Sequence, residues 1–512
     1  MNERLMDELN GIGLLVDRLD EHLLTNKARI DKDGLKYVST IEEKFRAINV
    51  EQLENDLKVV YLYTRANYKA ILQRMADTNF EVIHDGSMLV KQHKDYDDFV
   101  FKNYTLRIKA YREAIRLSQL SKKLNHFFVS QIYVNLSNVY VEMGRIVESI
   151  EELKKVEHLV DHFPMARGNL AIKHMSLTNL ITDRTVMRFL IEKGLAELEV
   201  VCASATPDVI PFDALQRFQE WERYMENLVD TYLSDDEPWS EKSDVDDVYK
   251  VWSAERNLAL NYVNIIYKKG NVDDVHMINM GVSYFKNENN MEYYSWFNTI
   301  KQEYNISRYF LYQIDSMRDD MTVHESQRYN TLINTLDYPA VGYRTELLKT
   351  SLKTAFSVLD KIGLFCCKFH KQNIRVQQID FHKWYKEIEL DVALRSPFNA
   401  LYWLSKDLDF KNGDMRVIRL LRNCIEHRYI RVIESYDVPF SEELADNSKY
   451  EYIVSYSDLE CATYETLRLV RRAIFYMANG FNVEYNRVYY GDSQDGVFIP
   501  LLLGTYDDEW KN

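Results

Sequence analysis

Residues 135–161 read NLSNVYVEMGRIVESIEELKKVEHLVD and carry apolar side chains at the three- and four-residue spacing of an α-helix. Gly144 interrupts this pattern and predicts a turn, because glycine adopts backbone conformations that other residues avoid. The small Ser137 and Ser149 would let the flanking helices approach each other closely. The stretch therefore predicts an antiparallel helical hairpin.

The hairpin resembles one tetratricopeptide (TPR) unit in its apolar-small-x-x-aromatic run, its glycine turn and its second helix. A weaker echo occurs at residues 262–275, with residues 268–271 as its turn. The helical period continues through the first three hundred or so residues. We therefore expect an all-α chain that begins with a TPR-like helical-repeat domain over residues 1–338. Irregular helical hairpins without a repeat ancestry are the alternative.

The composition supports this fold class and narrows the function. The 512 residues include only 16 glycines and 8 prolines, which disfavours collagenous, low-complexity and turn-rich all-β proteins. A hydrophobic content of 46% is enough for a large core and excludes global disorder. The net charge of −15 disfavours a protein that binds polyanions over its whole surface but permits a local basic patch.

The cysteines and the N-terminal residues indicate the cellular compartment of the protein. The five cysteines form no CxxC pair, which fits a reducing compartment better than a disulfide framework. The acidic N-terminus lacks the order of a secretory signal, and the longest charge-free run, residues 124–141, contains several amides that lipid would leave unsatisfied. We expect a cytoplasmic protein without a membrane partner.

A break at residues 338–340 precedes a long helical pattern over residues 344–371, so we place a domain boundary there. Residues 339–480 then predict a helical bundle with a few short strands, one of them within residues 450–456. Beyond Gly480 the pattern changes, and residues 481–512 predict an extended or strand-forming clasp. Residues 204–212 and 234–247 read as loops, the second of them acidic.

The sequence lacks the motifs of several common enzyme classes. It has no phosphate-binding GxxxxGK[ST] loop, no complete dinucleotide fingerprint, no HExxH and no GxSxG elbow. His158 and His162 lie four residues apart, but solvated histidines explain them better than a metal site. We therefore expect neither a cofactor nor a metal.

The remaining candidate is an amphipathic helix around residues 416–430. Asn423 and His427 are four residues apart and share a face, and the long side chain of Arg422 could reach around the helix toward them. A guanidinium can grip two phosphate oxygens, an imidazole can exchange a proton near neutral pH, and an amide can orient either partner. The three residue types therefore suit phosphodiester chemistry.

The Arg422-Asn423-x-x-x-His427 run resembles the motif of the HEPN superfamily, and the resemblance covers residues 341–480. It implies a metal-independent endoribonuclease, commonly a homodimer and commonly a toxin or antiviral-defence effector, with Arg422, Asn423 and His427 as catalytic residues. The looser arginine–histidine spacing also occurs elsewhere, at Arg167/His174, Arg318/His324 and Arg375/His382. Only Arg422 is followed by asparagine within an evident amphipathic helix.

Basic residues gather around this motif and are expected to bind the RNA substrate. The candidates on the motif helix and just after it are Arg416, Arg419, Arg428 and Arg431. A second cationic cluster is expected on the closing helix, at Arg468, Arg471 and Arg472. The acidic repeat region would bind a protein partner or trigger instead.

Two interpretations stay open. In the first, the 2′-hydroxyl of RNA attacks the adjacent phosphate, and a homodimer supplies the second histidine that an acid–base pair needs. In the second, Arg422 forms an ordinary surface ion pair with Glu426, His427 caps a core position, and the protein is a non-catalytic HEPN/TPR interaction scaffold.

Overall fold

The computed structural model describes residues 2–25, 31–82, 89–121, 123–181, 184–204, 210–232, 247–268, 272–278, 281–283, 291–317, 323–409, 413–434, 450–491, 498–500 and 509. The chain divides into two compact units, Met1–Trp239 and Ser240–Asn512. The boundary expected at residues 338–340 lies inside the second unit.

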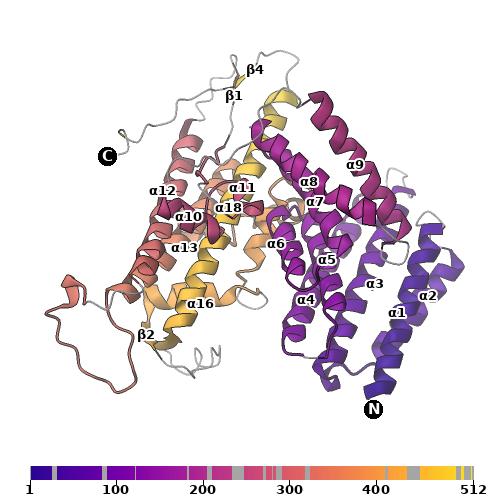
Figure 1. Ribbon diagram of the computed structural model, residues 1–512, viewed down its shortest axis with the longest axis horizontal. Helices are drawn as coiled ribbons and strands as arrows, with labels where there is room; N and C mark the ends of the chain where they lie inside the picture. Colours follow the sequence, from indigo (N-terminus) through magenta and orange to yellow (C-terminus); the bar gives the residue numbers. More distant parts are fainter. Residues whose placement is uncertain are drawn as a thin grey trace. The chain divides into compact units, whose positions relative to one another are not determined.

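The first unit is a succession of helices: the first helix packs against the second and the third, and from the third helix on each one packs against the next (Figure 1). Its helices are α1 (Asn2–Thr25), α2 (Lys32–Ala47), α3 (Asn55–Val82), α4 (Leu89–Gln119), α5 (His126–Glu142), α6 (Ile146–Glu157), α7 (Pro164–Thr178), α8 (Arg184–Ser204) and α9 (Phe212–Tyr232), with the 3-10 turn η1 (Val50–Gln52) before α3. Contacts also join α5 to α7 and α7 to α9, as expected where helical hairpins stack on each other.

The hairpin predicted from residues 135–161 is present as α5 and α6. Gly144 has a φ of 73° at the turn, a left-handed conformation that favours glycine. Ser137 and Ser149 are fully buried, and their hydroxyl oxygens lie 2.8 Å apart, so the two helices meet at these small side chains. The expected helical hairpin is therefore confirmed.

The second unit is a helical bundle with short strands. Its helices are α10 (Val248–Glu255), α11 (Val263–Ile266), α12 (Met291–Ser316), α13 (Tyr343–Phe369), α14 (Glu389–Leu394), α15 (Asn399–Lys406), α16 (Arg416–His427) and α18 (Tyr456–Gly491). It also contains the 3-10 turns η2 (Glu325–Gln327) and η3 (Val376–Gln378). Helix α13 is central, because it packs against α12, α16 and α18. This helix confirms the long helical pattern expected over residues 344–371.

Two small sheets accompany the bundle. Strand β2 (Tyr429–Ile433) pairs in parallel with β3 (Glu451–Ser455), and β1 (Gly281–Ser283) pairs antiparallel with β4 (Phe498–Pro500). Strand β3 confirms the strand expected within residues 450–456. Strand β2 begins two residues after α16 ends, so the sheet lies at the C-terminal end of the motif helix.

Two local expectations are wrong. Residues 481–491 are helical and not extended, because they continue α18 and bury Phe481 and Tyr485, four residues apart, on one face of that helix. At Gly480 the missing side chain leaves room for the ring of Phe398. Within residues 262–275, the described part forms only the short helix α11 and irregular backbone, so the weaker repeat echo is not a helical hairpin. Most of the acidic loop at 234–247 and of the segment after Pro500 lies outside the described residues.

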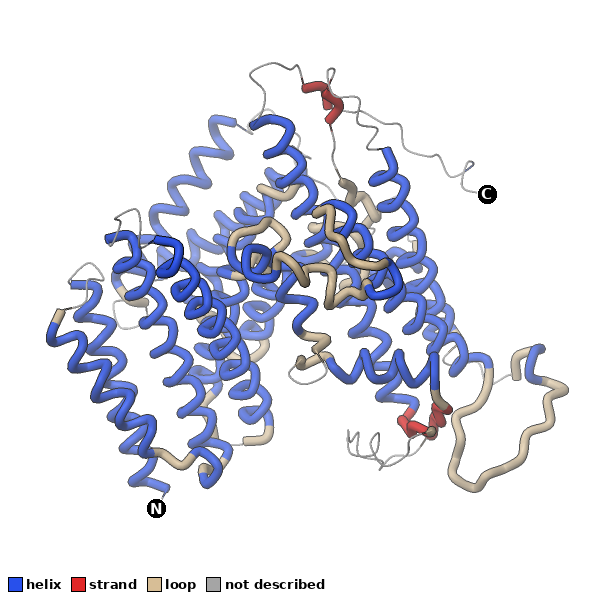
Figure 2. Tube along the Cα trace, turned by 180° about the vertical axis from the view of Figure 1, so that it is seen from behind, coloured by secondary structure: helices blue, strands red, loops and turns tan. Residues whose placement is uncertain are grey.

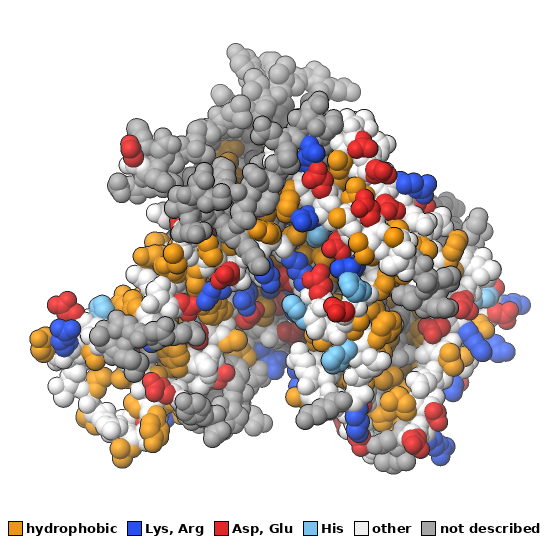
Figure 3. Space-filling view, in the orientation of Figure 1, with side chains coloured by type: hydrophobic (Ala, Val, Ile, Leu, Met, Phe, Trp, Pro, Cys, Tyr) orange, Lys and Arg blue, Asp and Glu red, His pale blue; other side chains and the backbone are white. Residues whose placement is uncertain are grey.

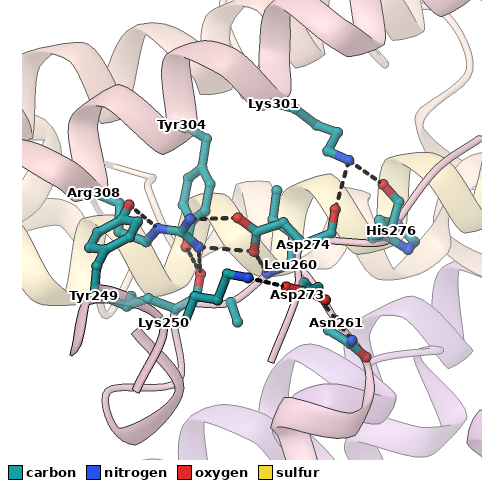
Figure 4. Close-up of polar contacts among 12 residues, drawn as sticks. Tyr249, Lys250, Leu260, Asn261, Asp273, Asp274, His276, Lys301, Tyr304 and Arg308 are labelled. Atoms are coloured by element: carbon teal, nitrogen blue, oxygen red, sulfur yellow. Dashed lines mark hydrogen bonds and ion pairs between the residues drawn. The ribbon is translucent and has the colours of Figure 1, made fainter. Parts of the chain in front are cut away.

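A buried ion pair attaches the segment before α12 to the bundle (Figure 4). Arg308 contacts both carboxylate oxygens of Asp274, at 2.5 and 3.0 Å, and donates to the hydroxyl of Tyr249 at 2.9 Å. Burial alone would raise the pKa of Asp274, but the Arg308 guanidinium holds it below its usual value. Arg308 on α12 therefore anchors, through its ion pair with Asp274, the loop that follows α11.

A search of the described helices found none that is long and apolar enough to cross a membrane.

Candidate active site

Helix α16 is amphipathic, as the sequence predicts. It buries Ile418, Leu421 and Cys424, which share one face and pack toward α13 and α18. Its other positions carry the polar residues of the motif. The helix ends at His427, where the backbone turns into an extended conformation at Arg428 and enters β2.

Arg422 and Asn423 contact each other directly. The guanidinium Nη1 of Arg422 donates a hydrogen bond to Oδ1 of Asn423 at 3.2 Å. The guanidinium also lies over the ring of Phe356 on α13, with its central carbon 5.4 Å from the ring centroid. The motif arginine therefore extends toward α13, and the adjacent amide is its hydrogen-bond partner.

A carboxylate on α13 is the second partner of Arg422. Nη2 of Arg422 lies 3.4 Å from Oδ2 of Asp360, which is long for a charge-assisted hydrogen bond, where about 2.7–2.9 Å is usual. Burial raises the pKa of Asp360, against the effect of the backbone hydrogen bond that it accepts from Phe381 and of the Arg422 charge. Because both side chains keep more than a quarter of their surface exposed, this ion pair holds the guanidinium only loosely.

His427 lies exposed at the end of α16, one helical turn after Asn423. Among the described residues it has no hydrogen-bond or ion-pair partner, so its ring is accessible to a ligand. This placement differs from the alternative in which His427 caps a core position. Glu426 pairs with Lys353 at 3.3 Å, so its described ion pair is with α13 and not with Arg422.

The arginines expected to bind RNA have different surroundings. Arg428 follows His427 and is exposed, and its side chain has no hydrogen-bond or ion-pair partner among the described residues. Arg419 lies 3.7 Å from Asp380, and Arg431 pairs with Asp337 and with Glu451. Arg416 is partly buried on the first turn of the helix. Arg428 is thus the cation that the structure leaves open beside the histidine.

The second cationic cluster is not a surface feature, so that expectation is wrong. Arg471 is only 1% exposed and donates through Nε to the backbone carbonyl of Ala259 at 2.8 Å. Arg472 is also buried, and Arg468 pairs with Glu465 at 2.6 Å. Burial removes Arg471 and Arg472 from any polyanion, whereas Arg468 keeps 31% of its side chain exposed and is paired with a carboxylate.

Residues that the motif search did not single out also line this side of α16. Asp380 accepts a hydrogen bond from Nδ1 of His382 at 2.7 Å and pairs with Lys383 at 2.8 Å. Burial would raise its pKa, but His382 and Lys383 lower it to about 2. Asp360 lies on the long helix α13, and Asp380 lies in the segment after η3. Neither residue is close to Arg422 in the sequence, so no local motif could predict that they lie near it.

No group of three or more histidine, cysteine or acidic side chains that could hold a metal ion occurs among the residues that the structure describes.

Comparison with known families identifies the C-terminal region. Residues 284–484 match the family model described as LA2681-like HEPN. The match includes α12, α13, α16 and most of α18, and therefore the whole of the site around Arg422. Comparisons with curated proteins and with solved structures gave no match.

Proposed function

Because the C-terminal part of this chain is an LA2681-like HEPN domain, we propose that the protein is a metal-independent endoribonuclease. The observation that carries the proposal is the arrangement on the last turns of α16, where Arg422 and Asn423 form a hydrogen-bonded pair and His427 lies exposed one turn further on.

Each motif residue has a role that follows from its chemistry. Arg422 binds the phosphate and stabilises the negative charge of the phosphorane, since a guanidinium can donate two parallel hydrogen bonds to phosphate oxygens. Asn423 orients that guanidinium through the 3.2 Å contact. His427 exchanges a proton with the substrate. Arg428 attracts the backbone electrostatically.

The cleavage step needs no added reactant. A base removes the proton of the 2′-hydroxyl, and the oxygen attacks the adjacent phosphorus. The bond from phosphorus to the 5′-oxygen breaks, and an acid protonates the leaving oxygen. The products are a 2′,3′-cyclic phosphate and a 5′-hydroxyl, and one histidine per chain supplies either the acid or the base but not both.

A homodimer would supply the second histidine, and an exposed apolar segment next to the site supports this proposal. Tyr329, Ile333 and Leu336 are 90%, 88% and 82% exposed, and Figure 3 shows apolar side chains over this segment at its lower left. The segment joins the sheet where Ala340 donates to the backbone carbonyl of Val432 (Figure 2). The C-terminal end of the segment therefore lies near the end of α16.

In the cell, we propose a toxin or antiviral-defence effector whose helical first unit controls the nuclease by binding a protein partner. The TPR-like hairpin of α5 and α6 is the observation that supports a partner-binding role for the first unit.

A cleavage assay tests the proposed activity. The full chain is incubated with single-stranded and structured RNA in the presence of EDTA, and the ends of the products are identified by mass spectrometry. The proposal predicts cyclic-phosphate and 5′-hydroxyl ends, and loss of cleavage in Arg422→Ala. Products with 5′-phosphate ends would contradict the mechanism.

The alternative is a non-catalytic interaction scaffold, and the contact between Arg422 and Asp360 favours it, because a structural ion pair needs no substrate. A measurement of RNA cleavage distinguishes the nuclease from the scaffold. A scaffold binds its partner but leaves RNA intact at every protein concentration.

A further inference from the structure

A buried lysine on α7 lacks a counter-ion in the described part of the chain. Lys173 is only 8% exposed, yet it forms no hydrogen bond or ion pair with any described residue. Its Nζ is not among the atoms that are completely buried, so a small ion can reach it. Lysine is almost never buried unless it is paired, because removing an ammonium group from water without a partner is costly. An unpaired lysine at this depth therefore points to a missing anion.

A second unused donor lies one helical turn earlier on α7. Asn169 is 3% exposed, and its Oδ1 accepts a hydrogen bond from Nη2 of Arg217 at 3.4 Å. Its Nδ2 is buried and has no acceptor among the residues that the structure describes. Asn169 and Lys173 are four residues apart on a helix and share a face. Because buried polar groups are normally hydrogen-bonded, this face of α7 lacks an acceptor for both side chains.

Arg217 on α9 brings a second cation to the same place. Its neighbour Phe218 is fully buried and packs against α7 at Gly168, where the missing side chain leaves room for the ring. Arg217 itself is exposed and forms no ion pair with a described carboxylate. Burial, and after it the charge of Arg217, lowers the pKa of Lys173 to about 8. The two cations therefore repel each other, and an anion beside them would relieve this repulsion.

The charges and the donors of this group favour a phosphate dianion over other anions. Two positive charges need two negative charges, and a carboxylate or a phosphodiester of a nucleic-acid backbone supplies only one. The donors come from two helices and can bind different oxygens of a tetrahedral group. Arginine and lysine are also the side chains that proteins commonly use to bind phosphate.

We propose that Lys173, Asn169 and Arg217 form a site for a phosphate dianion, either inorganic phosphate or the terminal phosphate of a small ester. Lys173 donates from the buried end of the site, Asn169 donates through Nδ2, and Arg217 closes the site from its exposed side. Because Asn169 already holds Arg217 through Oδ1, the amide can serve the guanidinium and the anion at the same time. The proposal concerns the first unit alone and holds whether or not the second unit cleaves RNA.

Isothermal titration calorimetry of the full-length protein tests the site. Inorganic phosphate, glycerol 3-phosphate and acetate are titrated at pH 8, where phosphates are dianions, and at constant ionic strength. Phosphate or its ester should bind at least about tenfold more tightly than acetate, the order expected for one additional partly desolvated charge. Tighter binding of the ester would identify a small phosphate ester as the ligand, and equal or weaker binding of the ester would identify inorganic phosphate.

Two substitutions change the site without changing its size. Lys173→Met removes the buried charge and should weaken phosphate binding by at least about tenfold. Asn169→Asp places a carboxylate against both cations, so it should abolish phosphate binding and raise the melting temperature measured without phosphate. A structural role of Asn169 alone would not produce this opposite response of binding and stability.

Lys155 on α6 provides a matched control, because its exposed ammonium group already pairs with Glu152 at 2.8 Å. Lys155→Met should bind phosphate as the unsubstituted protein does. Melting curves establish that all three variants are folded. The proposal is wrong if the unsubstituted protein does not bind phosphate or its ester, if acetate binds as tightly, if Lys173→Met or Asn169→Asp keeps the affinity, or if Lys155→Met loses it to the same extent.

Discussion

The guanidinium of Arg422 donates to Oδ1 of Asn423 at 3.2 Å, although the two residues are adjacent on α16. Adjacent helical positions point about 100° apart, so the contact requires the long arginine side chain to bend around the helix toward the next residue. It places an amide and a guanidinium side by side, one turn before an exposed histidine. This group of three side chains is the basis of the proposed nuclease.

Under the proposed mechanism, Asp360 would compete with the substrate phosphate for Arg422. Asp360→Asn removes a negative charge 3.4 Å from the guanidinium and should tighten RNA binding by about fivefold, which corresponds to about 1 kcal/mol for a partly exposed ion pair. Binding is measured by filter retention at fixed salt. Glu426→Gln removes a carboxylate that pairs with Lys353 and should give a smaller effect. Weaker RNA binding by Asp360→Asn would mean that the carboxylate positions Arg422.

Arg428 and Arg471 should respond in opposite ways to substitution by alanine. Arg428→Ala removes an exposed charge, so it should weaken RNA binding and reduce its salt dependence while the melting temperature stays unchanged. Arg471→Ala leaves the buried carbonyl of Ala259 without its donor and should lower the free energy of unfolding by about 1–3 kcal/mol. Equal effects of the two variants on RNA binding would place Arg471 at the RNA surface and contradict its burial.

Acid should destabilise the second unit through His276. Burial, with the nearby charges of Lys301 and Arg471, lowers the pKa of this histidine to about 3. Between pH 6.5 and 3 the unfolded chain therefore binds a proton that the folded chain does not, and the free energy of unfolding falls as the pH falls, by at most about 1.4 kcal/mol per pH unit. Urea denaturation of His276→Phe at several pH values should show a shallower decline than the unsubstituted protein.

His158→Gln serves as the control for this experiment, because His158 lies exposed in the first unit. It should leave the pH profile unchanged. If the profile of His276→Phe matches that of the control, His276 takes up its proton in the folded state, and the assignment of its buried neutral form fails.

The exposed segment around Ile333 should mediate self-association. Ile333→Asp places a charge on a surface that a homodimer would bury and should shift sedimentation equilibrium toward the monomer, with a parallel loss of RNA cleavage. Phe212→Asp, at a similarly exposed apolar position in the first unit, should affect neither. A dimer that survives Ile333→Asp would place the interface elsewhere.

Local structure could be predicted from the sequence where short-range patterns determine it. The hairpin around Gly144, the long helix α13 and the amphipathic helix α16 all follow from apolar spacing and from one glycine. The amphipathic pattern continues to Tyr429, but the helix ends at His427 because the chain is drawn into β2, a pairing with residues more than twenty positions away. Long-range pairing of this kind leaves little signal in the local spacing.

The same limit applies to the site. The four-residue spacing predicts that Asn423 shares a face with His427 and that Arg422 reaches around the helix toward them, and the structure pairs Arg422 with Asn423. Asp360 lies 62 positions from Arg422, and only the packing of α13 against α16 brings them together. Arg471 looked like part of a basic patch because arginine is usually exposed, yet it is buried where it meets the carbonyl of Ala259.

The most direct test of the central claim compares two histidines on the same bundle. His427 lies exposed one helical turn after Asn423, whereas His382 is held by Asp380. Single-turnover cleavage of RNA in EDTA is measured for His427→Ala and His382→Ala, with analysis of the product ends. The account predicts that His427→Ala slows cleavage by at least about a hundredfold, the usual contribution of a proton-transfer group, and that His382→Ala cleaves near the unsubstituted rate. Unchanged cleavage by His427→Ala would contradict it.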